Sequence, residues 1–363
     1  MDKAINFHPA WRSSSYYFFL DDVQKYPDAW LYVVWSRRGP GKTYSFLRSM
    51  YENRIPFVYM KRTKEDVDMI SMAGDIDISP FKPINRDAGT NIQAKSIRSG
   101  IAGFYDQTDE EGKPSGAPFA YILALNSIKT IKGMDLSEVD FICLDEFIPQ
   151  PGEKISRREG EMLLSIYMTV QRDRMKRGRG PLKLVLFSNA EEISTPITNE
   201  IEIVDSMAEL QGLGGSHHYD AEREIMLHHI TEEEIPLQEE EKTGIYKAMA
   251  KTAWGRKAFG GEFAGNDFSN VARQNLKGYR CIFSMLYREK MIYVYQQNGT
   301  YYLTYTRGQP RKHYDLTKEN DQKLIFYDEI IDIREACIEG KMKAEAYTMY
   351  DLVINFRKIY KVD

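Results

Sequence analysis

The sequence predicts an α/β fold with a largely parallel sheet, followed by a smaller domain of α+β structure. The apolar run 30–35 is followed by a glycine-containing loop, a helical segment and a second apolar run, which is the order of a βαβ unit. Two further runs, 139–144 and 182–187, are almost continuously apolar, as expected of parallel strands covered on both faces. From about residue 265 onward, strand-like runs alternate with turn signals such as Asn298-Gly299, which indicates a second domain.

The first βαβ unit begins with residues 30–35 as a buried strand. Residues 43–51 are the predicted helix, so the loop 36–43 joins the end of the strand to the start of the helix. Residues 55–60 are the next strand, whose Pro56 stands near the start, where a missing backbone donor matters least.

The rest of the first domain contains an insertion, a closing strand and a connector. Residues 96–126 resemble a β-hairpin with an exposed polar tip around 109–115. Residues 225–230 are expected to close the sheet. An acidic stretch and apolar residues at helical spacing follow, which indicates a helical connector. The expected parts are 1–232, 233–264 and 265–363.

Composition excludes several classes of protein. With 363 residues and 42% hydrophobic content, the chain can bury a full core. No apolar run approaches the roughly 18 residues that span a bilayer, and the start lacks signal-peptide character, so we expect no membrane contact and a cytoplasmic location. The net charge of −4 argues against a uniformly basic surface, but nucleic-acid binding depends on local charge, and residues 172–183 are strongly basic.

The cysteines and histidines do not suggest a metal site in the sequence. Cys143, Cys281 and Cys337 have no CxxC spacing, so we interpret them as packing residues. The pairs His217-His218 and His228-His229 are adjacent in strand-like segments, where neighbouring side chains point to opposite faces. Neither pair is therefore expected to ligate one ion.

The loop 36–43, with the sequence SRRGPGKT, has the features of a phosphate-binding loop. Such a loop surrounds phosphates with backbone N–H groups, while Lys42 neutralises the β and γ oxygens and the Thr43 hydroxyl holds magnesium. Ser36 stands where the usual pattern has its first glycine. Arg38 is either a further cation near the γ-phosphate or a surface residue that packs over the loop. The pattern predicts ATP and Mg²⁺ as ligands, bound by Arg38, Gly39, Gly41, Lys42 and Thr43.

An adjacent acidic pair, Asp145-Glu146, ends the strand 139–144. In open α/β sheets the carboxyl ends of the strands carry the groups that handle ligands. Asp145 is expected to hold the magnesium ion and Glu146 to polarise the attacking water, which favours hydrolysis over phosphoryl transfer. The alternative is a solvated loop. Asn189 follows the next strand with Ser188 and is expected either to sense the γ-phosphate or to form a simple turn.

Two groups of basic residues are candidates for contact with phosphate. The run 172–183 follows a helix-like segment, and one of its arginines would reach the nucleotide of a neighbouring subunit while others meet a nucleic-acid backbone. The alternative is a solvated helix end. Lys129 and Lys132 suit a loop that faces a central channel and binds DNA, or they are ordinary exposed lysines.

These segments resemble one family, the DNA-packaging ATPases of phi29-like phages, which are relatives of the large terminase motors. The resemblance rests on 36–43, 141–147, 170–174 and 186–190 and extends more weakly over nearly the whole chain. It implies a P-loop NTPase sheet of the ASCE type, a helical connector and an RNase H-like C-terminal domain. It also implies that Lys42, Glu146 and Arg172 are catalytic, with Arg172 acting in trans and Arg174 as the alternative.

The resemblance also implies the assembly. Members of this family form a ring of identical subunits, typically a pentamer, on the portal of an empty procapsid in the host cytoplasm. The ring threads double-stranded DNA through its pore, and some members use a phage-encoded packaging RNA, which this sequence neither supports nor excludes.

The C-terminal domain departs from the terminase pattern. A two-metal nuclease needs an acid in the first strand and others that converge on it. The expected first strand, 279–287, has none. Asp328 and Glu329 resemble a catalytic pair but are interpreted as structural. We therefore expect a non-cutting, ATP-driven DNA motor. The alternatives are a terminase with an active nuclease and a non-motor P-loop ATPase, switch or kinase.

Overall fold

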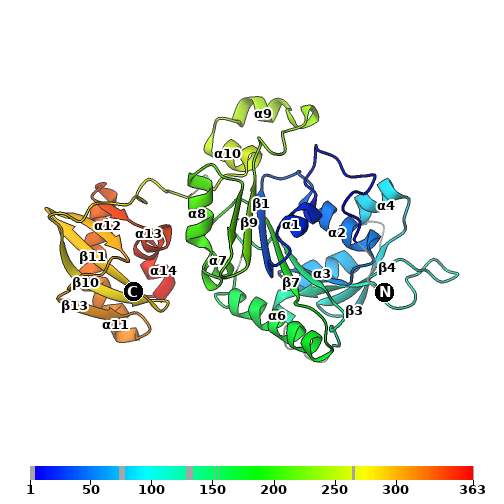
Figure 1. Cartoon of the computed structure of the whole chain (residues 1–363), viewed down its shortest axis with the longest axis horizontal. Coiled ribbons are helices and arrows are strands. Elements are labelled where there is room, and N and C mark those ends of the chain that lie inside the picture. Colours follow the sequence, from blue (N-terminus) through cyan, green and yellow to red (C-terminus); the bar gives the residue numbers. More distant parts are fainter. Residues whose placement is uncertain are drawn as a thin grey trace. The chain divides into compact units, whose positions relative to one another are not determined.

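The computed structural model describes residues 5–72, 78–127, 134–150, 152–153, 155–263 and 266–362. The chain forms two compact units. The first comprises Met1–Ile201 and Glu209–Gly265, and the second comprises Glu202–Ala208 and Asn266–Asp363. Figure 1 draws both units.

The first unit is built on a nine-stranded sheet in the order β3-β4-β5-β2-β6-β7-β1-β9-β8. The six central strands in this order, β5, β2, β6, β7, β1 and β9, run parallel to one another. The strands β3, β4 and β8 pair antiparallel at the two edges. This confirms the predicted α/β fold. The strands are β1 (Leu31–Ser36), β2 (Phe57–Lys61), β3 (Gln93–Arg98), β4 (Ile101–Tyr105), β5 (Ala120–Ala124), β6 (Phe141–Asp145), β7 (Lys183–Asn189), β8 (His217–Asp220) and β9 (Ile225–Ile230).

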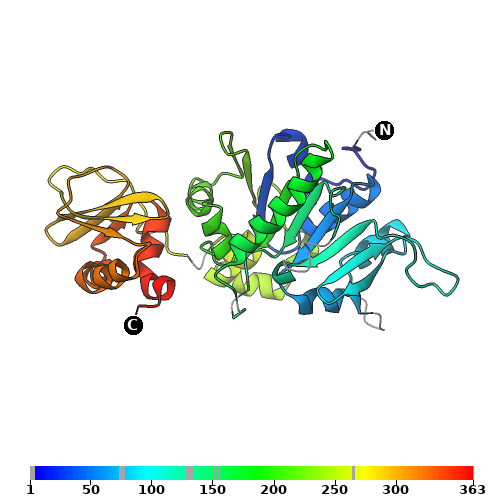
Figure 2. The same cartoon turned by 90° about the horizontal axis from the view of Figure 1, so that it is seen from below.

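Two expectations about the sheet need correction. The strand β9, expected to close the sheet, lies inside it between β1 and β8, because the segment before it forms an antiparallel partner. The β4–β5 hairpin is present, but β5 also pairs in parallel with β2, so it extends the main sheet and is not a separate insertion. Its polar tip projects away from the sheet, as Figures 1 and 2 show.

Helices cover both faces of this sheet (Figures 1 and 2). The helix α2 follows β1 directly, and its apolar residues Phe46, Leu47 and Met50 recur on one side of the helix and are fully buried. The long helix α6 lies on the opposite face of the sheet. The helical segments are α1 (Phe19–Lys25), α2 (Lys42–Glu52), α3 (Lys64–Ser71), α4 (Lys82–Ala88), η1 (Leu125–Ser127), α6 (Glu159–Lys176), α7 (Pro196–Glu200), η2 (Glu239–Glu241), α9 (Gly244–Met249) and α10 (Ala253–Gly260). The helix α8 (Val204–Gly212) is divided between the two units after Ala208.

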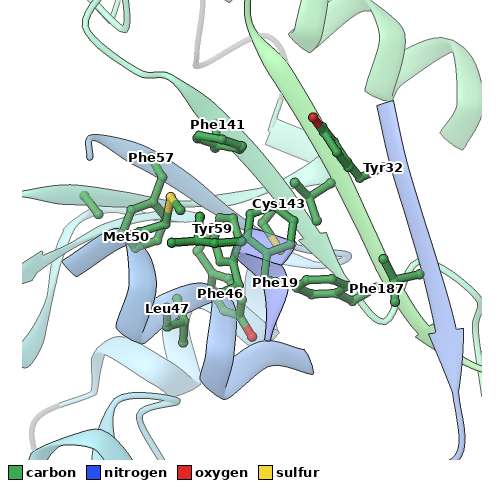
Figure 3. Packing of buried hydrophobic residues seen from close by; sticks show 14 of the residues in the cluster. Phe19, Tyr32, Phe46, Leu47, Met50, Phe57, Tyr59, Phe141, Cys143 and Phe187 are labelled. Carbon is green, nitrogen blue, oxygen red and sulfur yellow. The ribbon is translucent and has the colours of Figure 1, made fainter. Parts of the chain in front are cut away.

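The core between the sheet and helices α1 and α2 is aromatic. Phe19 of α1 and Phe46 of α2 pack edge to face, with ring centroids 5.2 Å apart, and Phe187 of β7 lies against both. Figure 3 shows these rings beside Cys143, which is a buried packing residue as expected. Each fully buried side chain of this size contributes about 1.5–3 kcal/mol. This packing fixes α2, and with it the loop that precedes α2.

The second unit contains a five-stranded sheet in the order β13-β10-β11-β12-β14, with helices packed on it. The β11–β12 hairpin turns at Asn298 and Gly299, both with positive φ, as the Asn-Gly signal predicts. The strands are β10 (Arg280–Tyr287), β11 (Lys290–Gln297), β12 (Thr300–Thr304), β13 (Lys312–Asp315) and β14 (Met342–Ala344). The helical segments are α11 (Glu319–Ile325), η3 (Phe326–Ile330), α12 (Ile331–Ile338), α13 (Tyr347–Ile354) and α14 (Phe356–Tyr360).

Within the described ranges, no helix combines the length and the apolar character that crossing a bilayer requires.

Candidate active site

The loop between β1 and α2 has the backbone that a phosphate-binding loop requires. Gly39 and Gly41 have φ values of 97° and 93°, a left-handed conformation that costs a glycine little. A Cβ on Gly39 would also lie 2.8 Å from Oε1 of Glu241. Ser36, by contrast, is the last residue of β1 and has no positive φ, so this position does not need glycine. The departure of Ser36 from the usual pattern therefore leaves the turn intact.

Lys42 begins α2 and is buried beneath the loop. Its ammonium group donates to the hydroxyl of Ser36 and to the carbonyl of Arg37, the latter at 3.2 Å. Burial lowers the pKa of Lys42 to about 7, against the opposing effect of Asp145. An anion bound at the loop would offset this desolvation, so the site favours a phosphate group.

Asp145 ends β6 and faces the start of α2. The hydroxyl of Thr43 lies 3.2 Å from both carboxylate oxygens of Asp145, and the hydroxyl of Tyr59 donates to Oδ2 at 2.6 Å. Carboxylate and hydroxyl oxygens next to a phosphate site are the ligands that Mg²⁺ uses. Thr43 and Asp145 therefore fit the role of magnesium ligands.

Glu146 adopts a left-handed backbone conformation with φ of 58°, which is uncommon for a residue other than glycine. The guanidinium of Arg62 holds this turn by donating to the carbonyls of Glu146 and Phe147 at 3.0 and 2.9 Å, and it also pairs with the buried carboxylate of Glu159. The side chain of Glu146 is 56% exposed. The turn thus directs this carboxylate away from the sheet, where it can reach a water molecule.

Lys61, the last residue of β2, lies between the two acids. Its ammonium nitrogen is 3.0 Å from Oε2 of Glu146 and 3.5 Å from Oδ2 of Asp145. Burial opposes the positive charge, but these two carboxylates outweigh burial and raise the pKa of Lys61. Sequence reasoning missed Lys61 and Tyr59. Their position at the end of an apolar strand could have revealed them, because β2 and β6 are neighbouring parallel strands whose carboxyl ends lie at the same edge of the sheet.

A cavity of about 320 Å³ collects most of the predicted site residues. Asn189 and Ser188 reach it as the final residues of β7, not as a turn after the strand. Arg38 lies at its rim and donates to Oε1 of Gln150 at 2.9 Å. The cavity is lined by Arg38, Gly39, Pro40, Gly41, Lys42, Thr43, Tyr44, Asp145, Glu146, Ser188 and Asn189.

The arginines predicted to act in trans, Arg172 and Arg174, do not line this cavity. The run 172–183 begins in the last turn of α6, which ends at Lys176, and continues through the loop that leads to β7; Arg172 is exposed. Arg174 is buried and donates to Oδ1 of Asp140 and to the carbonyl of Gly180, each at 2.9 Å. Arg174 therefore holds the end of α6 against the segments before β6 and β7. Lys129 and Lys132 lie outside the described residues.

The acids of the second unit are paired with a cation. The ammonium of Lys312 lies 2.8 Å from Glu329 and 3.6 Å from Asp328, and the strand β10 carries no Asp or Glu. In the described part of this unit, no three His, Cys, Asp or Glu side chains gather as metal ligands. This arrangement supports a structural role for Asp328 and Glu329.

Solved structures with a similar fold are phage packaging motors. A chain of the viral genome packaging motor assembly of bacteriophage Phi-29 matches 95% of this chain and 99% of its own, with 16% identity and a TM-score of 0.63. The Phi-28 gp11 DNA packaging motor matches 97% and 99%, with 14% identity and a TM-score of 0.57. No family model and no curated protein sequence matches the chain. The chain therefore shares the fold of these motor proteins over nearly its whole length.

Proposed function

We propose that this chain is the ATP-hydrolysing subunit of a phi29-like motor that drives double-stranded DNA into a phage procapsid. The observation that carries the proposal is the single cavity at which Lys42, Thr43, Asp145 and Glu146 meet. The similarity in fold to the packaging motors of Phi-29 and Phi-28 over nearly the whole chain supports the same proposal.

The polar residues that meet at the cavity have distinct tasks in this proposal. The loop N–H groups and Lys42 bind the β- and γ-phosphates of ATP. Thr43 and Asp145 hold Mg²⁺, which neutralises charge that develops on the phosphate oxygens. Glu146 accepts a hydrogen bond from the attacking water and orients it, and Asn189 at the end of β7 contacts the γ-phosphate or this water.

Subunit coupling is proposed to depend on Arg172. This residue is exposed near the end of α6, whereas Arg174 is held inside its own subunit. An arginine supplied by a neighbour stabilises the transition state and makes hydrolysis depend on assembly. The proposed assembly is a homo-oligomeric ring, taken as a pentamer.

The remaining partners follow from the motor role. The ring is proposed to attach transiently to the portal of a procapsid in the host cytoplasm, with a packaging RNA as an optional partner. Lys129 and Lys132 would contact the DNA backbone, and such contacts are independent of sequence and weaken steeply with salt. The C-terminal domain is proposed to be an RNase H-like module without nuclease activity.

The test is a packaging assay with purified chain, procapsids and linear double-stranded DNA, scored by ATP turnover and by DNA protected from DNase. Wild-type protein should show both activities. Glu146→Gln should lower turnover at least about a hundredfold and abolish protection, because the water loses its base. Glu110→Gln, at the exposed hairpin tip, is the matched control and should behave as wild type. ATP turnover that is unchanged in Glu146→Gln would overturn the proposal.

A further inference from the structure

One histidine from each adjacent pair meets Asp22 in the first unit. The strands β8 and β9 are antiparallel, and their register sets His217 opposite His228, with ring centroids 3.8 Å apart. Adjacent histidines on one strand do point to opposite faces, as expected. For this reason the sequence alone predicts no ligand role for these histidines. Pairing between the two strands, however, brings one member of each pair to the same face.

Asp22 bridges the two rings from helix α1. Its Oδ2 atom lies 2.8 Å from Nδ1 of His228, and its Oδ1 atom lies 3.3 Å from Nε2 of His217. One ligand atom from each of the three side chains lies within 4.8 Å of the others. The side chains of Asp22 and His228 are only 3% and 2% exposed, and that of His217 is 18% exposed. Three ligand atoms thus converge on one small buried volume.

Asp22, His217 and His228 form a triad. Further hydrogen bonds orient its side chains, as in metal sites. The second ring nitrogen of His228 lies 2.9 Å from Oε2 of Glu234, and the second nitrogen of His217 lies 2.9 Å from the hydroxyl of Ser216. The hydroxyl of Tyr17 donates to Asp22 at 2.7 Å. Histidines that ligate metals make such a bond with the nitrogen that faces away from the ion, because it fixes the ring orientation and the tautomer.

The charge of the cluster also suits a cation. His228 lies between the carboxylates of Asp22 and Glu234. These two carboxylates lie 2.8 and 2.9 Å from the two nitrogens of one buried ring, so the cluster places two negative charges beside the proposed ligand atoms. A divalent ion in place of the proton between His228 and Asp22 would balance the two carboxylates.

An adjoining cavity supplies access to the triad. Its volume is about 740 Å³, and its walls include His217, His228, Asp22 and Glu234 together with several residues of the N-terminal segment between His8 and Phe18. A metal site with three protein ligands needs a position for water and a route for the ion. The cavity provides both.

We propose that Asp22, His217 and His228 bind one divalent transition-metal ion, with Zn²⁺ preferred. Two imidazole nitrogens and one carboxylate oxygen are ligands that Zn²⁺ accepts in tetrahedral sites, whereas Mg²⁺ and Ca²⁺ select oxygen. The site is separate from the nucleotide cavity and shares no residue with it.

The ion would link helix α1, and the N-terminal segment that leads into it, to the β8–β9 hairpin. This segment also supports the phosphate-binding loop, because the backbone N–H of Tyr17 donates to the carbonyl of Pro40 at 2.9 Å. The N–H of Phe19 donates to the hydroxyl of Ser45 in α2 at 2.8 Å. Metal binding is therefore expected to stabilise the first unit as a whole.

The test is titration of the metal-stripped full chain with Co²⁺ and then Zn²⁺. Wild-type protein should bind one Co²⁺ with the visible absorption of a four-coordinate nitrogen and oxygen site, Zn²⁺ should displace it, and the melting temperature should rise. His217→Ala removes a ligand and should weaken binding at least about tenfold, because loss of even an outer-shell partner of a ligand costs about 10–100-fold. His218→Ala removes an exposed histidine of the same strand and should bind as wild type.

A further variant separates this site from the nucleotide site. Asp145→Asn removes the proposed magnesium ligand and should leave the Co²⁺ spectrum unchanged, so that failure of either proposal is seen independently. Absence of the Co²⁺ band and of any melting shift in wild-type protein would overturn the inference. Equal Co²⁺ affinity in wild-type and His217→Ala proteins would also overturn it.

Discussion

The guanidinium of Arg37 donates a hydrogen bond to the carboxylate of Glu241, 2.7 Å away, and so links the phosphate-binding loop to the acidic segment before α9. The side chain of Arg37 is only 5% exposed, and it also donates to the carbonyls of Arg38 and Pro236. Because a buried arginine needs its counter-ion, the conformation of the loop is coupled to that of this segment.

The first prediction concerns this ion pair. Glu241→Gln should reduce the free energy of unfolding by about 1–2 kcal/mol and raise the KM for ATP, because it leaves a buried cation without a full counter-charge. The figure is below that of a fully buried pair, since the side chain of Glu241 is 33% exposed. Denaturant unfolding and ATPase kinetics measure the two effects.

The matched control for Glu241 is a glutamate two residues earlier. Glu239 is 84% exposed and pairs with Lys242, so Glu239→Gln should change stability by less than about 0.5 kcal/mol. Equal losses in the two variants would show that Arg37 does not depend on Glu241.

The second prediction concerns Lys61. Lys61→Met should lower kcat by about tenfold or more with a smaller change in KM, because Glu146 loses the cation that positions its carboxylate. Lys61→Arg keeps the charge and should recover part of the rate. Steady-state ATPase assays measure both constants. A large rise in KM at unchanged kcat would contradict a positioning role and indicate a role in binding.

The order of the elements around the site could be predicted from the sequence, because a local pattern of residue types marks each element. The apolar strands, the loop 36–43 and the acidic pair at the end of β6 all lie where expected. Near-continuous apolar runs are typical of parallel strands, and glycines at 39 and 41 mark a left-handed backbone.

What the sequence did not reveal depends on contacts between distant segments. Lys61 meets Glu146 only because β2 pairs with β6, and His217 meets His228 only because β8 turns back on β9. A single sequence does not state strand order or register. For the same reason Arg174 stood as an alternative to Arg172, although packing of α6 against the segment before β6 buries Arg174 and leaves Arg172 exposed.

The third prediction is that the C-terminal domain does not cut DNA. Incubation of the full chain with supercoiled plasmid and Mg²⁺ or Mn²⁺ should yield no nicked or linear product, because Asp328 and Glu329 face Lys312. Gel electrophoresis measures the products. Cleavage that Asp328→Ala abolishes would instead establish a nuclease and contradict the structural assignment.

The fourth prediction concerns Arg174. Arg174→Met should destabilise the protein by about 3 kcal/mol, because two backbone carbonyls and Asp140 lose a buried donor. Asp140 keeps a second partner in Arg179, 3.0 Å away, which limits the loss. Thermal and denaturant unfolding measure it. Arg172→Ala, at an exposed position on the same helix, is the comparison and should change stability by less than about 0.5 kcal/mol.

The last prediction tests whether Arg172 acts on a neighbouring subunit. An Arg172→Ala chain keeps Glu146, and a Glu146→Gln chain keeps Arg172, so each alone should be nearly inactive in ATP hydrolysis. When equal amounts assemble at random, about a quarter of the interfaces join an intact Glu146 to an intact Arg172. The mixture should then recover a corresponding part of the wild-type rate, and this part should fall on dilution as rings dissociate. An arginine that served its own subunit would restore nothing, since every chain would still lack one of the two groups.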